Sequence, residues 1–405
     1  MAALKYWVWL TTLPGLTEYN KLLLMEHFSS PEDIYYADQE ALWQVEGLGK
    51  EQAALLDNKS MAEADRILAD CARKGIFLIT MADALYPERL RNIYQPPLLL
   101  YGKGAMPLFD EEVAVAVVGT RDGTPYGVHC AEKLGYELAQ QGGMVVSGMA
   151  KGIDAAAMRG ALRAGGFTCG VLGGGVDVVY PAENRRLYED IAATGVLLSE
   201  YPPQTRPEAW HFPVRNRILS GLSVAAVVVE APAKSGALIT AGNAVEQGRE
   251  VFAVPGPIDA PNSVGCHQLI REGAGLVTCA WDILGEYESR YPHKLRRQQV
   301  SVPPLPRDVL AAKAAKRKEK EKEQEPPASL SRLTAEEAAA LSEDQRGVLR
   351  ALRVDMPLLT DQLAEETGLP IQRVLPALTL LEISGWAVQN GARSFVRTVE
   401  LPEEE

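Results

Sequence analysis

Residues 113–120 have the sequence VAVAVVGT, an unbroken run of small and β-branched apolar residues that ends in Gly119 and Thr120. A polar loop follows, and residues 127–141 then have the spacing of an amphipathic helix. Continuous apolar strands that alternate with helices are typical of a parallel sheet covered on both faces. This stretch therefore predicts the α/β fold class.

The same alternation of strand and helix continues along the chain. Further Val-rich strands are expected at residues 144–148, 168–172, 196–199, 224–230 and 251–254. Helical spacing occupies the intervening residues 153–165, 184–193 and 238–247. The pattern predicts a doubly wound parallel sheet within residues 113–290, and it places a binding site beyond the carboxyl ends of the strands.

A helical module and a connector are expected before the sheet. Residues 1–75 have helical patterning, and their glycine-containing turns at residues 13–16 and 45–50 resemble those of helix-hairpin-helix or SAM-like modules. Such a turn can point backbone amides at a phosphate, but a compact packing module is the favoured interpretation, which the acidic balance of the segment supports. Residues 76–112 are expected to connect the two regions through an extended stretch with one short strand at residues 98–101.

The region after the sheet is expected to contain a linker and a winged helix. Residues 291–340 include alternating Lys and Glu between two Pro-Pro pairs. This pattern favours a solvated spacer over a basic arm that helps to hold nucleic acid. The winged helix is expected within residues 341–399, with helices at 343–354, 360–367 and 371–384 and a hairpin at 386–397 with Asn390-Gly391 at its tip. Its third helix contains a single cation, Arg373, and we expect Pro376 to interrupt that helix. These features favour contact with protein over reading of DNA.

The charge of the chain is distributed unevenly. The 405 residues include 41 basic and 53 acidic side chains, for a formal net charge of −12. Over the whole chain this argues against a protein that coats polyanions. Residues 1–112 and 336–405 each carry −7, however, whereas residues 113–291 carry −4 and residues 292–335 carry +6. The composition therefore leaves room for a selective anion-binding groove in the α/β region.

Cysteine and histidine usage points away from disulfides and metals. The five cysteines form no C-x-x-C pair, and the five histidines show no metal-ligand spacing, so neither a disulfide framework nor a metal site is expected. The apolar run at residues 6–13 is too short to span a bilayer, and no later stretch is long enough. We expect a cytoplasmic protein with no membrane partner.

Two loops after the first strands have the composition of an anion site. Residues 119–121 combine a tight turn at Gly119 with the guanidinium of Arg121, which can clamp a phosphate. The loop matches neither G-x-G-x-x-G nor a P-loop, so neither a dinucleotide nor ATP is favoured, and no cofactor is expected. The second strand ends in Ser147-Gly148, where small side chains allow a ligand to approach. Asp154 is either a ligand-binding group or a helix cap.

Three later segments extend the candidate site. Residues 173–175 are consecutive glycines, which suit either close approach of a ligand or a tight packing turn. Residues 212–217 place two arginines beside an aromatic ring, which suits phosphates and a stacked base. In the alternative, these arginines pair with carboxylates such as Glu200 and Glu230. Residues 235–240 form another small-residue loop before a helix.

The strand ends contain no set of residues typical of catalysis. No Ser-His-Asp or Cys-His arrangement falls there, and His211 and His267 are isolated and are expected to be structural. The sequence therefore predicts no catalytic residue, and the protein is not expected to be an enzyme.

The order of these motifs carries a family resemblance. With Val118-Gly119-Thr120-Arg121, Gly152-Ile153-Asp154 and Phe212-Pro213-x-Arg215-Asn216-Arg217, the chain resembles the DprA (Smf) family of DNA-processing proteins of natural transformation. The resemblance implies an extended Rossmann-like domain that binds single-stranded DNA, forms a homodimer and loads the RecA recombinase without catalysis. The DNA-binding residues that it implies are Gly119, Thr120, Arg121, Ser147, Gly148, Lys151, Gly173, Gly174, Phe212, Arg215, Asn216, Arg217, Ser235, Gly236 and Thr240. His267, where Asn is more usual, and the uncharged Val178-Val179 depart from the family pattern.

Two other functions are compatible with the sequence. The sheet also resembles that of the nucleotide-monophosphate phosphoribohydrolases of the lysine-decarboxylase-like group, for which Glu230 would be the candidate acid. Their Pro-Gly-Gly-x-Gly-Thr string is absent, because residues 173–177 have the sequence GGGVD. A purely structural adaptor would bind no oligonucleotide at all.

Overall fold

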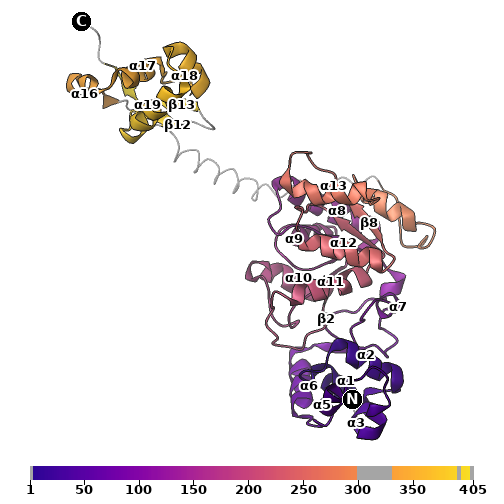
Figure 1. Cartoon of the computed structure of the whole chain (residues 1–405). Helices are drawn as coiled ribbons and strands as arrows, with labels where there is room; N and C mark the ends of the chain where they lie inside the picture. Colours follow the sequence, from indigo (N-terminus) through magenta and orange to yellow (C-terminus); the bar gives the residue numbers. More distant parts are fainter. Residues whose placement is uncertain (1–2, 299–330, 390–393, 402–405) are drawn as a thin grey trace. The chain divides into compact units, whose positions relative to one another are not determined.

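The computed structural model describes residues 3–298, 331–389 and 394–401, in two compact units, Met1–Val302 and Pro303–Glu405 (Figure 1). Most of the predicted charged linker and the predicted hairpin tip at Asn390-Gly391 lie outside the described residues.

A nine-stranded sheet forms the centre of the first unit, in the order β1-β2-β6-β5-β4-β3-β7-β8-β9. Six of its strands correspond to the predicted Val-rich runs, and they run parallel to one another. They are β3 (Val113–Val118), β4 (Gly143–Ser147), β5 (Thr168–Val171), β6 (Val196–Ser199), β7 (Ala225–Val228) and β8 (Glu250–Ala253). The predicted α/β class and doubly wound parallel sheet are confirmed.

Three further strands extend this sheet, and the sequence pattern revealed only one of them, β2. β1 (Phe77–Thr80) and β2 (Leu99–Gly104) add to one edge, where β2 pairs antiparallel with β6. β9 (Gly275–Leu276) adds to the other edge beside β8. The segment expected to be a connector therefore contributes two strands of the sheet, and its expected single strand corresponds to β2.

Helices cover both faces of the sheet. Val113, Val115 and Val117 of β3 pack in one core with α8 (Pro125–Gln140), α9 (Ile153–Arg163) and α10 (Arg185–Thr194). Ala114 and Ala116 pack in a second core with α11 (His211–Gly221), α12 (Gly236–Glu246) and α13 (Val264–Arg271). Every residue of β3 is buried. This two-sided burial explains why the strand is continuously apolar. Two four-residue helices, α7 (Glu88–Arg91) and α14 (Trp281–Leu284), complete this part.

The predicted N-terminal helical module belongs to the same unit. It consists of α1 (Leu4–Thr12), α2 (Glu18–His27), α3 (Pro31–Tyr36), α4 (Gln39–Trp43), α5 (Lys50–Leu55) and α6 (Ala62–Lys74). Gly15 and Gly47 adopt φ values of +82° and +87° in the two predicted turns, where a side chain would be strained. Lys74 at the end of α6 donates to Asp177 over 2.6 Å, and Asp70 accepts from Gln204 over 2.8 Å. The module thus holds two loops that follow strands of the sheet.

The second unit has the predicted winged-helix plan. Its helices are α16 (Ala335–Ala340), α17 (Glu343–Ala351), α18 (Thr360–Thr367) and α19 (Ile371–Ile383). β11 (Leu358–Leu359), β13 (Ser394–Arg397) and β12 (Ala387–Gln389) form its three-stranded sheet, and β10 (Ser331–Arg332) pairs with β14 (Val399–Glu400). The expected interruption at Pro376 is wrong, because α19 continues through this residue. A proline inside a helix removes one backbone donor, and here the buried Val374, Leu378 and Leu381 keep the helix packed on the core.

Within the described residues, no helix is long and apolar enough to cross a membrane.

Candidate functional site

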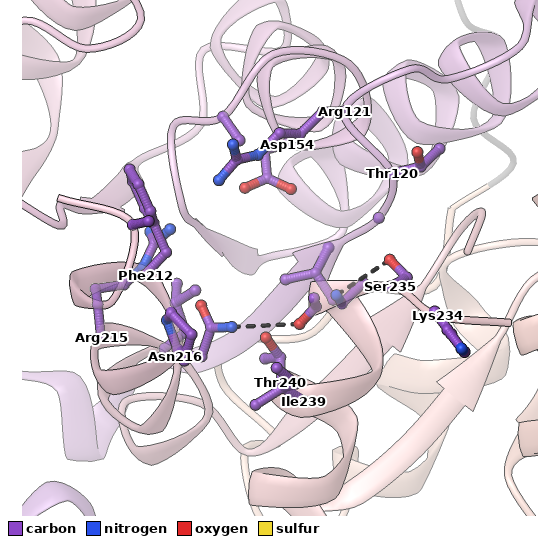
Figure 2. A pocket seen from close by; sticks show the side chains of 18 of the residues that line it. Thr120, Arg121, Asp154, Phe212, Arg215, Asn216, Lys234, Ser235, Ile239 and Thr240 are labelled. Atoms are coloured by element: carbon purple, nitrogen blue, oxygen red, sulfur yellow. Dashed lines mark hydrogen bonds between the residues drawn. The ribbon is translucent and has the colours of Figure 1, made fainter. Parts of the chain in front are cut away.

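A cavity of about 550 Å³ lies beyond the carboxyl ends of β3 and β7 (Figure 2). Its walls come from the loop after β3, the start of α9, and the loops and first turns of α11 and α12. Nine of the predicted site residues line it, namely Gly119, Thr120, Arg121, Phe212, Arg215, Asn216, Ser235, Gly236 and Thr240. Segments that are distant in sequence therefore meet where the sheet topology predicts a binding site.

Arg121 is an exposed cation of the predicted set. Its guanidinium carbon lies 4.9 Å from the centroid of the Phe212 ring, and within the described residues it forms no ion pair or side-chain hydrogen bond. The Phe212 ring is 5.6 Å from that of Tyr180, with 33° between the planes, and Tyr180 is 46% exposed. A cation over one ring and a second exposed ring beside it can hold a phosphate and a stacked base together.

Close packing fixes the loop that carries Arg121. A Cβ on Gly119 would lie 2.6 Å from the side chain of Ile153, and one on Gly152 would lie 2.5 Å from the carbonyl oxygens of Thr120 and Arg121. Gly152 also has a φ of +79°. Glycine at these two positions lets the loop rest directly against the first turn of α9, so the backbone position of Arg121 is well defined.

Three helix N-termini surround the cavity, those of α9, α11 and α12. Ser235 caps α12 by accepting a hydrogen bond from the Ala237 amide over 3.3 Å. Asn216 of α11 donates to the Gly236 carbonyl oxygen over 3.3 Å, which joins the two helices (Figure 2). Helix N-termini carry partial positive charge and unpaired amides. The helix N-termini therefore add to the positive charge of the arginines, and both favour an anionic ligand in the cavity.

Two buried charges, Asp154 and Arg215, form the floor of the site. Arg215 is only 4% exposed and donates to the carbonyl oxygen of Val171. Burial lowers the pKa of the Arg215 guanidinium to about 10, with Asp154 opposing that shift, so Arg215 stays charged at neutral pH. Burial raises the pKa of Asp154, and Arg215 opposes that shift in turn.

Asp154 is not the N-cap of its helix. Gly152 occupies the cap position of α9, and the Asp154 carboxylate instead accepts a hydrogen bond from the Gly148 amide over 3.1 Å. A Cβ on Gly148 would lie 2.3 Å from a terminal nitrogen of Arg215. The predicted Gly148 is therefore required by the close approach of Arg215, and it does not line the cavity.

Arg217 differs most from expectation, because it does not line the cavity. Its guanidinium pairs with both oxygens of Glu200, at 2.6 and 2.7 Å, and both side chains are largely buried. The alternative considered from sequence, an arginine paired with Glu200, describes this residue. Residues 215 and 217 of α11 point in different directions, since they are separated by two positions on a helix of 3.6 residues per turn.

The other predicted residues lie behind or beside the cavity. Ser147 is fully buried and donates to the Val117 carbonyl oxygen over 2.6 Å, which links β4 to β3. Lys151 forms an exposed ion pair with Asp122 at 2.9 Å. A Cβ on Gly173 would lie 3.0 Å from the Phe212 ring, and one on Gly174 would lie 2.9 Å from the Thr205 carbonyl oxygen. The two glycines therefore form a tight packing turn.

The enzyme alternative depends on Glu230, which does not line the cavity. Its two carboxylate oxygens accept hydrogen bonds from the amide and the hydroxyl of Thr124, over 2.9 and 2.5 Å. His211 contacts the Gly173 carbonyl oxygen at 2.8 Å and stacks on Tyr201, and His267 contacts the Gly256 carbonyl oxygen at 3.0 Å. Among the described residues, no group of three or more potential ligands could hold a metal ion.

Several residues of the cavity were not among the DNA-binding residues that the family resemblance implies, although Asp154 was considered as a ligand-binding group. They are Asp154, Tyr180, Lys234 and Ile239, together with small residues and prolines of the same loops. Lys234 is an exposed cation directly before the Ser235 cap. Its position beside a predicted anion-binding loop could have identified it from the sequence. Tyr180 follows the glycine turn and is brought to the cavity by its contact with Phe212.

Comparison with known proteins identifies the relatives of the chain. The family model described as DNA recombination-mediator protein A matches residues 77–288, and that of the DprA winged helix domain matches residues 332–392. The DNA processing protein DprA of Bacillus subtilis is 44% identical over 225 residues, which cover 56% of this chain and 76% of that protein. Protein Smf of Synechocystis sp. is 33% identical over 405 residues, covering 97% and 98% of the two chains.

A solved structure agrees with these matches. The X-ray structure of DprA from Streptococcus pneumoniae has a TM-score of 0.62 and 36% sequence identity, and the match covers 70% of this chain and 97% of that one. The chain belongs to the DprA/Smf family of DNA-processing proteins.

Proposed function

We propose that the chain binds single-stranded DNA in the cavity beyond β3 and β7. The observation that carries this proposal is the exposed guanidinium of Arg121 over the Phe212 ring, beside Tyr180. The cation meets a backbone phosphate, the rings offer their faces to a base, and Lys234 adds a second exposed cation to the rim.

The site should prefer a single strand to a duplex. Stacking on Tyr180 or Phe212 requires an unpaired base, since the faces of paired bases are covered by their neighbours. The flanking acidic modules, at −7 each, oppose the approach of a duplex with its higher charge density. Discrimination should therefore come from both stacking and repulsion.

A titration of single- and double-stranded oligonucleotides of equal length, at two salt concentrations, tests the proposal. We expect at least about tenfold tighter binding of the single strand, and a loss of affinity on raising the salt for both. Binding that is equal for both forms would contradict a stacking site, and no binding of either would favour the adaptor alternative. Release of free base from AMP would instead support the enzyme alternative.

We also propose that the protein loads the RecA recombinase and acts as a homodimer through its Rossmann-like domain. The match to a family described as recombination mediators supports the first part. Exposed apolar side chains after β8 and on α13 support the second, since Ile258 is 94% and Val264 43% exposed. Strand exchange by RecA on protein-coated DNA, and the mass of the protein in solution, measure the two properties.

Removing the winged helix should leave single-strand affinity within about threefold of the full chain. The exposed side chains of α19 include Leu375, Leu380 and Ile383, and its single cation, Arg373, is paired with Asp344 at 2.5 Å. A surface of this kind lacks the free cations that hold a phosphate backbone. The first unit has its own two cores, so a chain ending before residue 331 should fold. A tenfold or greater loss in an anisotropy titration would assign a DNA contact to the winged helix.

A further inference from the structure

A second polar cavity lies at the opposite end of the sheet from the proposed DNA site. It has a volume of about 160 Å³ and is lined by Arg89, Val224, Gly248, Arg249, Glu250, Tyr287 and Arg290. Val224 directly precedes β7 and Glu250 begins β8, so this cavity is at the amino ends of the strands. The parallel strands between the two cavities are about 13 Å long at four residues each.

Arg89 has a structural role in this cavity. It is 8% exposed and forms an ion pair with Asp110 at 3.1 Å. Its remaining nitrogens donate to the carbonyl oxygens of Leu222 and Glu112 and to the hydroxyl of Tyr291. The charge of Arg89 is thus balanced by Asp110, and its donors are occupied within the fold.

The other two arginines are not balanced in this way. Arg249 donates one terminal nitrogen to the Arg89 carbonyl oxygen over 2.8 Å, but its Nε is buried without an acceptor among the described residues. Arg290 is exposed, and its guanidinium carbon lies 5.4 Å from the centroid of the Tyr291 ring. Within the described part of the chain, neither forms an ion pair with a carboxylate. Burial and the charges of Arg89 and Arg290 lower the pKa of Arg249.

The cavity therefore has an excess of positive charge. Glu250 is the one carboxylate among the residues that line it, against the guanidinium groups of Arg249 and Arg290, since Asp110 balances that of Arg89. A buried guanidinium nitrogen without an acceptor costs free energy unless a ligand supplies one. Because guanidinium groups recognise the oxygens of phosphate with two donors at a time, we propose that Arg249 and Arg290 hold a phosphate group in this cavity.

The phosphate could come from two sources that share this chemistry. One is a small phosphorylated compound, for which a volume of about 160 Å³ leaves room for a phosphate and little else inside the cavity. The other is the backbone of a nucleic acid. Neither source depends on the proposed DNA site at the carboxyl ends of the strands, so the two proposals can fail separately.

The test is a calorimetric titration with inorganic phosphate in the R121A background, which removes the exposed arginine of the first cavity. We expect saturable binding with one site per chain. R249Q and R290Q, each added to R121A, should weaken it at least about tenfold, as expected for loss of a charge-assisted contact. R271Q removes an exposed arginine of α13 and serves as the matched control, with binding unchanged.

Arg290 is exposed, so R290Q should fold normally even if R249Q disturbs the contact with Arg89. Saturable binding that both R249Q and R290Q leave intact would overturn the proposal, as would no saturable binding of phosphate. A titration of the otherwise wild-type R290Q variant with a single strand of about 20 nucleotides, longer than common single-strand site sizes, then identifies the source. Weaker DNA binding together with weaker phosphate binding supports a backbone phosphate, and unchanged DNA binding with weaker phosphate binding supports a small phosphorylated compound.

Discussion

Replacing Arg121 with alanine should lower the affinity for single-stranded DNA by about ten- to hundredfold. The side chain is exposed, stands over the Phe212 ring and has no carboxylate partner among the described residues, so its charge is available to a phosphate. Removing one phosphate contact should also reduce the slope of log affinity against log salt by about 0.7. Anisotropy titrations at several salt concentrations measure both quantities.

The matched control for this variant is Arg66→Ala. Arg66 is also exposed, but it lies on α6 and pairs with Glu63 at 2.5 Å, so the net charge changes equally while the cavity does not. We expect R66A to bind like the wild type. Equal salt slopes for R121A and the wild type would show that no phosphate contacts Arg121, and they would remove the observation on which the proposed DNA site rests.

The place of this site in the fold could be predicted from the sequence. The strand positions followed from continuous apolar runs such as residues 113–118, because a strand buried on both faces cannot alternate. The topology of parallel strands then brought the loops at Arg121, Phe212 and Ser235 to one edge. For this reason a site made from four distant segments was largely predictable.

The direction of individual side chains was not predictable. Arg215 and Arg217 look equivalent in sequence, but their positions on α11 send one toward the cavity floor and the other toward Glu200. Similarly, β1 and β9 are short edge strands whose pairing depends on tertiary contacts more than on local composition. Partners at long sequence separation decide these features, and a pattern of neighbouring residues does not contain them.

Replacing Arg215 with alanine should lower the free energy of unfolding by about 3 kcal/mol. Arg215 is 4% exposed, and its guanidinium opposes the rise of the pKa of Asp154. Without it, Asp154 stays buried and loses the positive charge that opposes the rise of its pKa, and the contact with the Val171 carbonyl oxygen is lost as well. Chemical denaturation should show this loss, and Arg215→Lys, which keeps the charge, should recover part of it.

The cost of Arg215→Ala should grow as the pH rises. The pKa of Asp154 is already raised by burial, so its contribution to stability is full below the unfolded pKa and is lost as the pH rises through the folded pKa. Without Arg215 the folded pKa of Asp154 rises further above its unfolded pKa. The variant therefore loses stability over a wider range of rising pH than the wild type does. The difference from the wild type should therefore be larger at about pH 8 than at about pH 5.

The double variant R215A/D154N isolates this effect. In the wild type, the Gly148 amide donates a hydrogen bond to the Asp154 carboxylate over 3.1 Å. The side-chain amide introduced by D154N cannot ionise, but its oxygen can still accept this hydrogen bond. We expect the double variant to be more stable than R215A near neutral pH. The free energy of unfolding lost on removing Arg215 from the D154N variant should not depend on pH. If R215A loses the same stability at both pH values, with or without D154N, then its cost comes from lost packing, and the two buried charges do not depend on each other.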